Sequence, residues 1–198
     1  MKISTKLFCA LSILMLFLLT SCASTKVTGE WKDPNLADKK FEKIMVLGVA
    51  KQPKDRKFYE DEFVKQLKAK GVMAVSSHTL ISHENMRDKE TIVQTIESMG
   101  FDGVIISRVG NIHSKQRDYY NVRMYDYYDS GFAMMSPYQA GIRTNTQKFG
   151  FESNLYDAKT EKLAFSVSSD TYAQDNIQKR LGSYIRTVIN KMRQNKLL

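Results

Sequence analysis

Three histidines are the first residues of this chain whose side chains could bind a metal or transfer protons. His78 and His83 lie five residues apart, Glu84 follows directly, and His113 is distant in the sequence. A zinc protease of the HExxH type carries both histidines on one helical turn, so that both imidazoles reach the same ion. The spacing here does not fit that geometry. We expect exposed loop histidines and no metal site, with a three-histidine site as the less favoured alternative.

The motifs of covalent hydrolysis and of phosphate binding are missing from the sequence. No G-x-S-x-G nucleophile elbow occurs, and no S-x-x-K occurs after residue 21. Gly48 ends a predicted strand, but the next residues lack the glycines and the K-[ST] end of a phosphate-binding loop. Glu60 and Asp61 are explained by an early helical turn, where the helix dipole favours acids. The sequence therefore predicts a protein that is not an enzyme and needs no cofactor.

A hydrophobic segment near the start of the chain indicates export. Lys2 and Lys6 precede an apolar run from Leu7 to Thr20, which is 20 − 7 + 1 = 14 residues long. As a helix this run would measure roughly 21 Å, too short to span a hydrocarbon core of about 30 Å. A positive start, an apolar run and small residues before a break form a secretory signal peptide. Residues 1–21 are therefore predicted to be a signal peptide.

The end of this leader, Leu19-Thr20-Ser21-Cys22, resembles the lipobox of bacterial lipoproteins. The resemblance implies that the Cys22 thiol is diacylglycerated and that the chain is cut before it. Cys9 leaves with the leader, so the mature chain has no second cysteine for a disulfide. Two or three acyl chains hold a protein on a lipid bilayer effectively permanently. Ala23 stands where Asp often signals inner-membrane retention, which favours the outer membrane. We expect the anchored protein on the periplasmic face of that membrane.

The composition is that of one basic domain. Removal of residues 1–21 leaves 198 − 21 = 177 residues, enough for a single domain with a substantial core. The net charge falls from +9 to about +7 with the loss of Lys2 and Lys6. A basic surface can bind nucleic acid, but export excludes that partner. Anionic lipid headgroups, lipopolysaccharide or acidic envelope polymers are the expected counterparts, and solvated surface lysines are the simpler alternative.

A tyrosine-rich segment is the strongest candidate for a binding surface. Residues 115–146 show neither helical nor strand periodicity and form a predicted insertion. Tyrosine combines a large contact area with few rotatable bonds and a hydroxyl, and it recurs at recognition surfaces. The alternative is a locally packed or unstructured insertion. The candidate binding residues are Tyr119, Tyr120, Tyr125, Tyr127, Tyr128 and Tyr138.

The segments that must position these residues alternate between strands and helices. Residues 22–40 lack periodicity and are predicted to be a lipidated tether. The continuous apolar run in 41–50 predicts a strand buried on both faces. Helices are predicted from Pro53 to about Lys70 and from near Asp88 to Met99, with short strands at 72–75 and 103–106.

The alternating pattern of 147–171 predicts an antiparallel hairpin with one buried face. A last helix with a basic outer face follows Asp175. The order βαβαβ–loop–ββα predicts an α/β (mixed α+β) domain at 41–195, with about five strands in a mixed sheet and three helices packed on it.

These segments together resemble a family of uncharacterised bacterial envelope lipoproteins. The domain of this family is similar in outline to the amino-terminal α/β domain of TolB and to the periplasmic domain of the curli secretion lipoprotein. The resemblance implies the same fold and transfers no catalytic residue, because its motifs are structural. The matching motifs are Trp31-Lys-Asp-Pro34, the strand KIMVLGVA, Phe58-Tyr-Glu60-Asp61, Gly71-Val-Met-Ala74 and the hairpin Leu155-Tyr-Asp157…Thr160-Glu-Lys-Leu163.

The expected function is therefore that of a membrane-anchored interaction or assembly module. Its expected partners are the lipid bilayer, through Cys22, and an envelope protein, and a second copy of the chain is a further candidate. The alternative is an envelope hydrolase or glycan-binding protein with a cleft beside the tyrosine-rich segment. A histidine with a carboxylate partner, or a buried pair of acids, lining a pocket there would favour this alternative.

Overall fold

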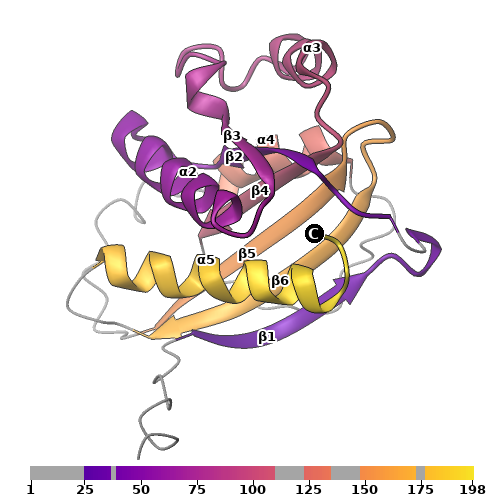
Figure 1. Cartoon of the computed structure of the whole chain (residues 1–198). Coiled ribbons are helices and arrows are strands. Elements are labelled where there is room, and N and C mark those ends of the chain that lie inside the picture. The colour runs from indigo at the N-terminus through magenta and orange to yellow at the C-terminus, as the bar shows by residue number, and fades with distance from the viewer. Residues whose placement is uncertain (1–24, 37–38, 110–122, 135–147, 173–176) are drawn as a thin grey trace, which may run out of the picture.

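The computed structural model describes residues 25–36, 39–109, 123–134, 148–172 and 177–198 (Figure 1). A single mixed sheet of six strands, in the order β1-β6-β5-β4-β2-β3, forms the centre of one domain. The strands are β1 (Thr25–Lys32), β2 (Lys43–Gly48), β3 (Met73–Ser76), β4 (Gly103–Val109), β5 (Lys148–Asp157) and β6 (Leu163–Tyr172). The helices are α2 (Pro53–Lys68), α3 (Lys89–Met99), α4 (Met124–Met134) and α5 (Ile177–Gln194), with short 3-10 helices η1 (Pro34–Leu36) and η2 (Ser77–Thr79).

The mixed α/β class is confirmed, with more elements than predicted. The described residues form six strands and four α-helices, whereas the sequence predicts about five strands and three helices. The two additional elements are β1 and α4. Both lie in segments that show no clear periodicity in the sequence.

The parallel half of the sheet follows the prediction closely. Strand β2 pairs in parallel with β3 on one side and with β4 on the other. The side chain of Asp88 accepts a hydrogen bond from the Thr91 amide and caps α3, and Gly100 ends this helix with a φ of 65°. Gly71 has a φ of 83° just after α2. Local capping signals were therefore sufficient to predict these helix ends.

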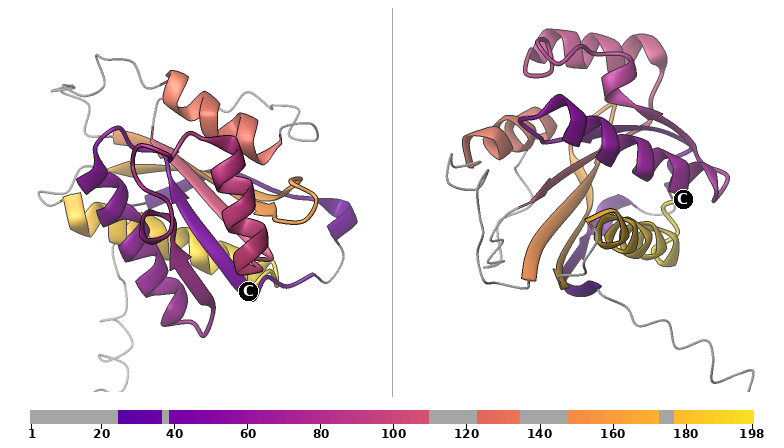
Figure 2. Two further views of the ribbon diagram at one scale, coloured as in Figure 1. Left: turned by 90° about the horizontal axis from the view of Figure 1, so that it is seen from above. Right: turned by 90° about the vertical axis from the view of Figure 1, so that its left-hand side faces the viewer.

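Helices cover both faces of the sheet and divide the core into two layers. One layer packs α2 and α5 against the sheet, and the other packs α3 and α4 against the opposite face. Figure 2 shows α4 and α5 on opposite sides of the antiparallel strands. Strand β2 supplies Ile44 and Val46 to the first layer and Met45 and Leu47 to the second. The predicted burial of this strand on both faces is confirmed.

The hairpin of β5 and β6 is also buried on both faces, which corrects the prediction of one buried face. Leu155 and Phe165 pack in the first layer with α5, as the alternating pattern predicts. Tyr156 and Leu163 pack in the second layer, beneath α4. Glu152, which lies on the same face of β5 as Tyr156, is buried as well. The prediction was wrong because nothing in the hairpin sequence indicates a helix over its polar face.

Residues 25–32 form a strand of the sheet and not a free tether. Strand β1 pairs antiparallel with β6 from Thr25, opposite Thr171, to Lys32, opposite Phe165. A shift in the pairing between Val27 and Gly29 interrupts its regular pattern, which explains why the sequence shows no clean alternation. The predicted tether at 22–40 is therefore wrong over this range. In α3, Met99 continues the helical spacing of the buried Ile92 and Ile96 but is 40% exposed.

Hydrogen exchange provides a direct test of strand β1. The amides between Thr25 and Lys32 that bond to β6 are expected to exchange as slowly as amides of β5, because both belong to the same hydrogen-bonded sheet. The measurement is amide exchange by NMR on the mature protein. The β1 amides that point away from β6 serve as the internal control and should exchange faster. Uniformly fast exchange across 25–32 would show that these residues form a tether and not a strand.

Candidate functional site

Only part of the predicted binding and lipidation set lies within the described residues. Cys22, Tyr119, Tyr120 and Tyr138 lie outside them. The other three tyrosines lie on α4. The prediction that the whole 115–146 segment lacks regular structure is therefore wrong for residues 124–134.

Helix α4 buries two of its three candidate tyrosines. Tyr127 is 4% exposed, and Tyr128 is fully buried. Tyr127 packs on Tyr156, with 5.9 Å between the ring centroids, and Tyr128 meets Phe132 edge to face at 5.1 Å. Burial raises the pKa of both phenols, so they stay neutral. These two side chains are part of the core and are not available to a partner, which corrects their assignment as binding residues.

Tyr125 is the candidate tyrosine of α4 that reaches the surface. Its hydroxyl donates a hydrogen bond of 2.6 Å to the carbonyl oxygen of Arg87. The Arg87 guanidinium in turn bonds to Asp129, with Nη2 2.6 Å and Nε 3.0 Å from Oδ1. These contacts fasten the outer side of α4 to the segment before α3. Tyr125 therefore has a structural role, because its hydroxyl joins α4 to the segment before α3.

The far end of α4 approaches the place where ligands commonly bind in α/β sheets. From β2 the chain passes through α2 to β3, which lies on one side of β2. It then returns through α3 to β4, which lies on the other side of β2. The carboxyl ends of β2 and β4 thus form the topological switch point of the parallel strands. A Cβ atom on Gly131 of α4 would lie 3.0 Å from a methyl group of Val49, directly after β2. Helix α4 therefore packs closely against this edge.

A buried ion pair lies at the same edge. The side chains of Arg56 and Glu60 are 1% and 0% exposed, and Arg56 Nε donates to Glu60 Oε1 over 3.0 Å. The same oxygen accepts from the Gly48 amide at 2.9 Å and from Ser77 Oγ at 2.6 Å, while Oε2 accepts from the His78 amide at 2.7 Å. Protein donors thus occupy both oxygens. Glu60 ties β2, η2 and α2 together and does not act as an open general base.

A chain of hydroxyl groups continues from this edge through the sheet. The Tyr59 hydroxyl donates to Ser107, Ser107 bonds to Ser153, and Ser153 bonds to the Tyr184 hydroxyl. The four residues come from α2, β4, β5 and α5. Burial raises the pKa of Tyr59 and Tyr184, so both remain protonated donors at neutral pH. The chain satisfies polar groups inside the first core layer.

His78 and Asp61 form a partly exposed pair, the arrangement that would favour a hydrolase if it lined a pocket. His78 Nε2 lies 2.6 Å from Asp61 Oδ1, and Ser76 Oγ donates to that same oxygen over 2.8 Å. A catalytic triad instead places the histidine between serine and acid. Partial burial alone would raise the pKa of Asp61, but hydrogen bonds from Lys57, His78 and Ser76 lower it to about 2. Asp61 is therefore a constant anion that holds η2 on α2.

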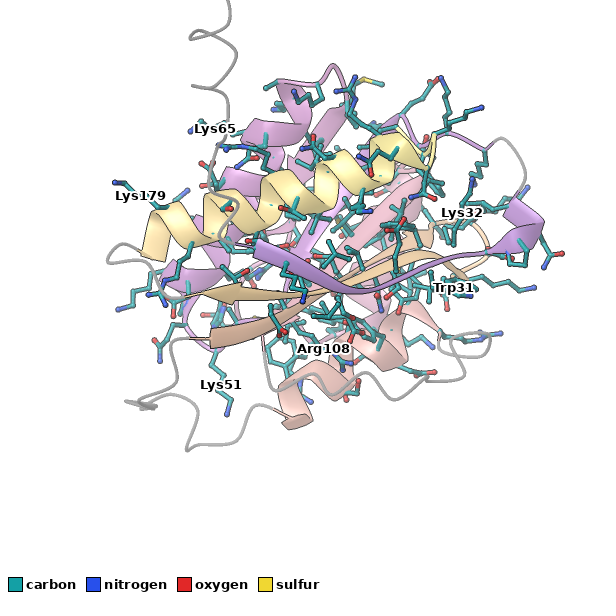
Figure 3. The ribbon with its side chains drawn as sticks, turned by 90° about the horizontal axis from the view of Figure 1, so that it is seen from below. Trp31, Lys32, Lys51, Lys65, Arg108 and Lys179 are labelled. Carbon is teal, nitrogen blue, oxygen red and sulfur yellow. The ribbon has the colours of Figure 1, made fainter. Side chains whose placement is uncertain are left out.

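A second buried ion pair lies beneath α4. Arg108 Nη2 is 3.3 Å from Glu152 Oε1, and the two residues are directly opposite on β4 and β5. The Arg108 guanidinium lies 4.3 Å from the centre of the Tyr127 ring. Figure 3 shows Arg108 between the sheet and α4. This cation beneath the ring explains how a polar strand face accepts a covering helix.

The described residues do not assemble a metal centre. They contain no group of three or more His, Cys, Asp or Glu side chains arranged around one ion. His113 lies outside the described residues. The prediction of exposed loop histidines is wrong for the two histidines that the structure describes. His78 belongs to η2 and its side chain is 17% exposed, and His83, in the turn region after η2, is only partly exposed.

Sequence reasoning missed the buried ion pair of α2, although the pattern contains a signal for it. Arg56 and Glu60 continue the buried positions of Phe63 and Leu67 at helical spacing. Charged residues on an apolar stripe at i and i+4 indicate a buried pair. By contrast, no local pattern relates Arg108 to Glu152, because their contact depends on strand pairing.

Removal of the Glu60 carboxylate is expected to be strongly destabilising. Glu60→Ala leaves the Arg56 guanidinium buried without its counter-ion, which should lower the free energy of unfolding by about 3–5 kcal/mol. The neighbouring Asp61→Ala is the matched control and should lower it by less than about 1 kcal/mol, because Asp61 is half exposed. Urea unfolding midpoints measure both. Equal midpoints for the two variants would contradict the structural role of Glu60.

Tyr128 distinguishes a core role of α4 from a binding role. Tyr128→Ala should lower the free energy of unfolding by about 3–5 kcal/mol, since it empties a fully buried aromatic site. Tyr128→Phe should change it by less than about 1 kcal/mol, because the hydroxyl has no hydrogen-bond partner among the described residues. Thermal and urea unfolding provide the readout. A stable Tyr128→Ala variant would mean that this side chain is available for binding.

No family model and no curated protein matches the chain. Among solved structures, PelC from Paraburkholderia phytofirmans, described as a dodecamer, aligns with 83% of this chain and 95% of its own at 13% identity and a TM-score of 0.46. A variant of that dodecamer gives 13% identity, 83% and 94% coverage and a TM-score of 0.45. Phosphoribosylglycinamide formyltransferase from Streptococcus pneumoniae aligns with 78% of this chain and 96% of its own at 13% identity and a TM-score of 0.26. These similarities assign neither a family nor a site residue.

Proposed function

We propose that this protein is a lipid-anchored envelope protein that works as a non-enzymatic interaction or assembly module. Acyl chains on Cys22 hold it on the periplasmic face of the outer membrane. The domain presents its surface to an envelope protein or to a second copy of the chain. The lipobox resemblance of Leu19-Thr20-Ser21-Cys22 supplies the anchor in this proposal.

The observation that carries the proposal is the position at which the sheet begins. Strand β1 starts at Thr25, three residues after Cys22. Among the described residues, both core layers are built from residues after position 26. Cleavage before Cys22 would leave all of these core residues in the mature chain.

The polar groups at the switch point support a structural interpretation of the domain. Glu60 accepts four hydrogen bonds from protein groups, and Glu152 is paired with Arg108. Carboxylates engaged in this way stabilise the fold and offer no free base to a substrate. Helix α4 packs over the same region. Among the described helices, none is long and apolar enough to cross a bilayer.

Metabolic labelling with a fatty acid tests the anchor. Cys22→Ala should abolish incorporation of label and leave the leader uncleaved, because the thiol is the acceptor of the diacylglyceryl group. Cys9→Ala is the matched control and should be labelled and cleaved like the parent. Mass spectrometry of the mature amino terminus gives the processing site. Label that survives in the Cys22→Ala protein would refute the lipoprotein assignment.

Crosslinking in intact envelopes, followed by identification of the products, tests the module part of the proposal. Specific products with an envelope protein or with a second copy would support it. A protein that forms no specific product, but whose purified form cleaves an envelope polymer, would favour the hydrolase alternative.

A further inference from the structure

Helix α5 has an unusual balance of charge. Its 18 residues include no acid and five basic residues. Lys191 is paired with Glu30, with 2.9 Å between the charged atoms. Three of the others are exposed and have no carboxylate partner among the described residues, and they are Lys179, Arg186 and Arg193.

These three cations lie in one row along the outer side of α5, which we call the basic stripe. Successive members are seven residues apart, or nearly two helical turns, so they share one face and are separated by about 10 Å. The opposite side of the helix is buried in the first core layer through Leu181, Ile185 and Val188. Figure 3 shows Lys179 at the start of α5, directed away from the sheet. The stripe therefore faces outward.

Acids near the stripe do not cancel its charge. Glu30, beside the last turns of α5, is engaged by Lys191. Glu62 of α2, which lies near Gly182, is engaged by Lys65 at 3.2 Å. At the far end of the stripe, an open depression adds further basic side chains, since its lining includes Lys40, Arg193 and Lys196.

The stripe lies close to the point where the lipidated end enters the domain. Thr25 Oγ1, at the start of β1, donates a hydrogen bond of 3.4 Å to Ser183 Oγ. Ser183 follows Lys179 by one turn of α5 and precedes Arg186 by three residues. Two residues separate Cys22 from Thr25, so the three steps along the chain between them span at most about 11 Å. A bilayer that holds the acyl chains of Cys22 is therefore within reach of α5.

We propose that the basic stripe docks on anionic phospholipid headgroups of the bilayer that holds the anchor, with α5 lying along its surface. The inference rests on the proposed lipidation of Cys22. A cation near an anionic bilayer improves binding by about fivefold, so three cations together shift the balance between docked and undocked domain by on the order of a hundredfold. Docking would leave the opposite layer, with α3 and α4, facing away from the membrane and accessible to a partner.

The test measures how close α5 lies to the headgroups. In the mature lipidated protein Cys22 is blocked by its lipid, so an introduced cysteine is the single free thiol. Asn190→Cys places a fluorophore on the exposed side of α5 between Arg186 and Arg193, and Glu97→Cys places it on the exposed side of α3. The labelled proteins are reconstituted in phosphatidylcholine vesicles with or without phosphatidylglycerol. Lipids that carry a spin label on the headgroup quench a nearby fluorophore.

Docking predicts several-fold stronger quenching at position 190 than at position 97, only in vesicles that contain phosphatidylglycerol. High salt should reduce the difference, since it screens exposed charges. The triple variant Lys179→Gln, Arg186→Gln, Arg193→Gln should lower quenching at 190 to the level seen in pure phosphatidylcholine. The control variant Lys54→Gln, Lys159→Gln, Lys162→Gln loses the same charge from exposed sites off the stripe and should behave like the parent.

The outcomes separate the docking from the anchor. A protein that lacks the lipid and does not float with vesicles contradicts the proposed anchor and the docking with it. An anchored protein with equal quenching at both positions, or with quenching that is independent of phosphatidylglycerol, overturns the docking alone. A stripe that responds to an added acidic polymer or to a protein, but not to anionic vesicles, overturns the assignment to phospholipid.

Discussion

The buried carboxylate of Glu60 is the interaction on which the arrangement of the parallel strands depends. It accepts hydrogen bonds from the Gly48 amide at the end of β2 and from the guanidinium of Arg56 on its own helix. It also accepts hydrogen bonds from the hydroxyl of Ser77 and the amide of His78, which follow β3. These groups belong to three segments that would otherwise end with unsatisfied donors in a dry environment. A single anion therefore fixes how α2 sits on β2 and how the chain leaves β3. The neighbouring chain of hydroxyl groups from Tyr59 to Tyr184 likewise pairs buried polar groups of β4, β5 and α5 with one another.

The second constraint is that the antiparallel half of the sheet is covered on both faces. Helix α5 covers the apolar face of β5 and β6, and α4 covers a face that carries the buried pair of Arg108 and Glu152. Tyrosine suits this second interface, because its ring packs on Tyr156 or over a guanidinium while it remains neutral. The tyrosine content of α4 therefore serves packing over polar residues. Recognition, if it uses tyrosines, falls to positions other than Tyr127 and Tyr128.

The edge strand β1 connects the fold to the proposed site of action. Because β1 is hydrogen-bonded to β6 from Thr25 onward, the domain is separated from Cys22 by only a few residues and not by a tether of 18 residues. Such a short link restricts the orientation of the domain relative to an anchoring bilayer. In the proposed orientation, the helix without acids faces the headgroups, and the layer of α3 and α4 faces away from them. The domain would then be held in one orientation on the membrane and would present the layer of α3 and α4 to a partner.

The sequence alone predicted the elements whose signals are local. The buried run of β2, the capping of α3 by Asp88 and Gly100, the inward positions of α2 and α5 and the mixed α/β class follow from periodicity and from cap residues. It also placed Cys22 in a lipobox-like context. Three features became visible only in the folded molecule: the strand at 25–32, the core positions of Tyr127 and Tyr128, and the contact between Arg108 and Glu152. These features depend on pairing between distant strands and on which helix covers which face of the sheet. Side chains at these contacts need only fit their partners across the interface. The sequence around them therefore shows no periodicity from which the contact could be predicted.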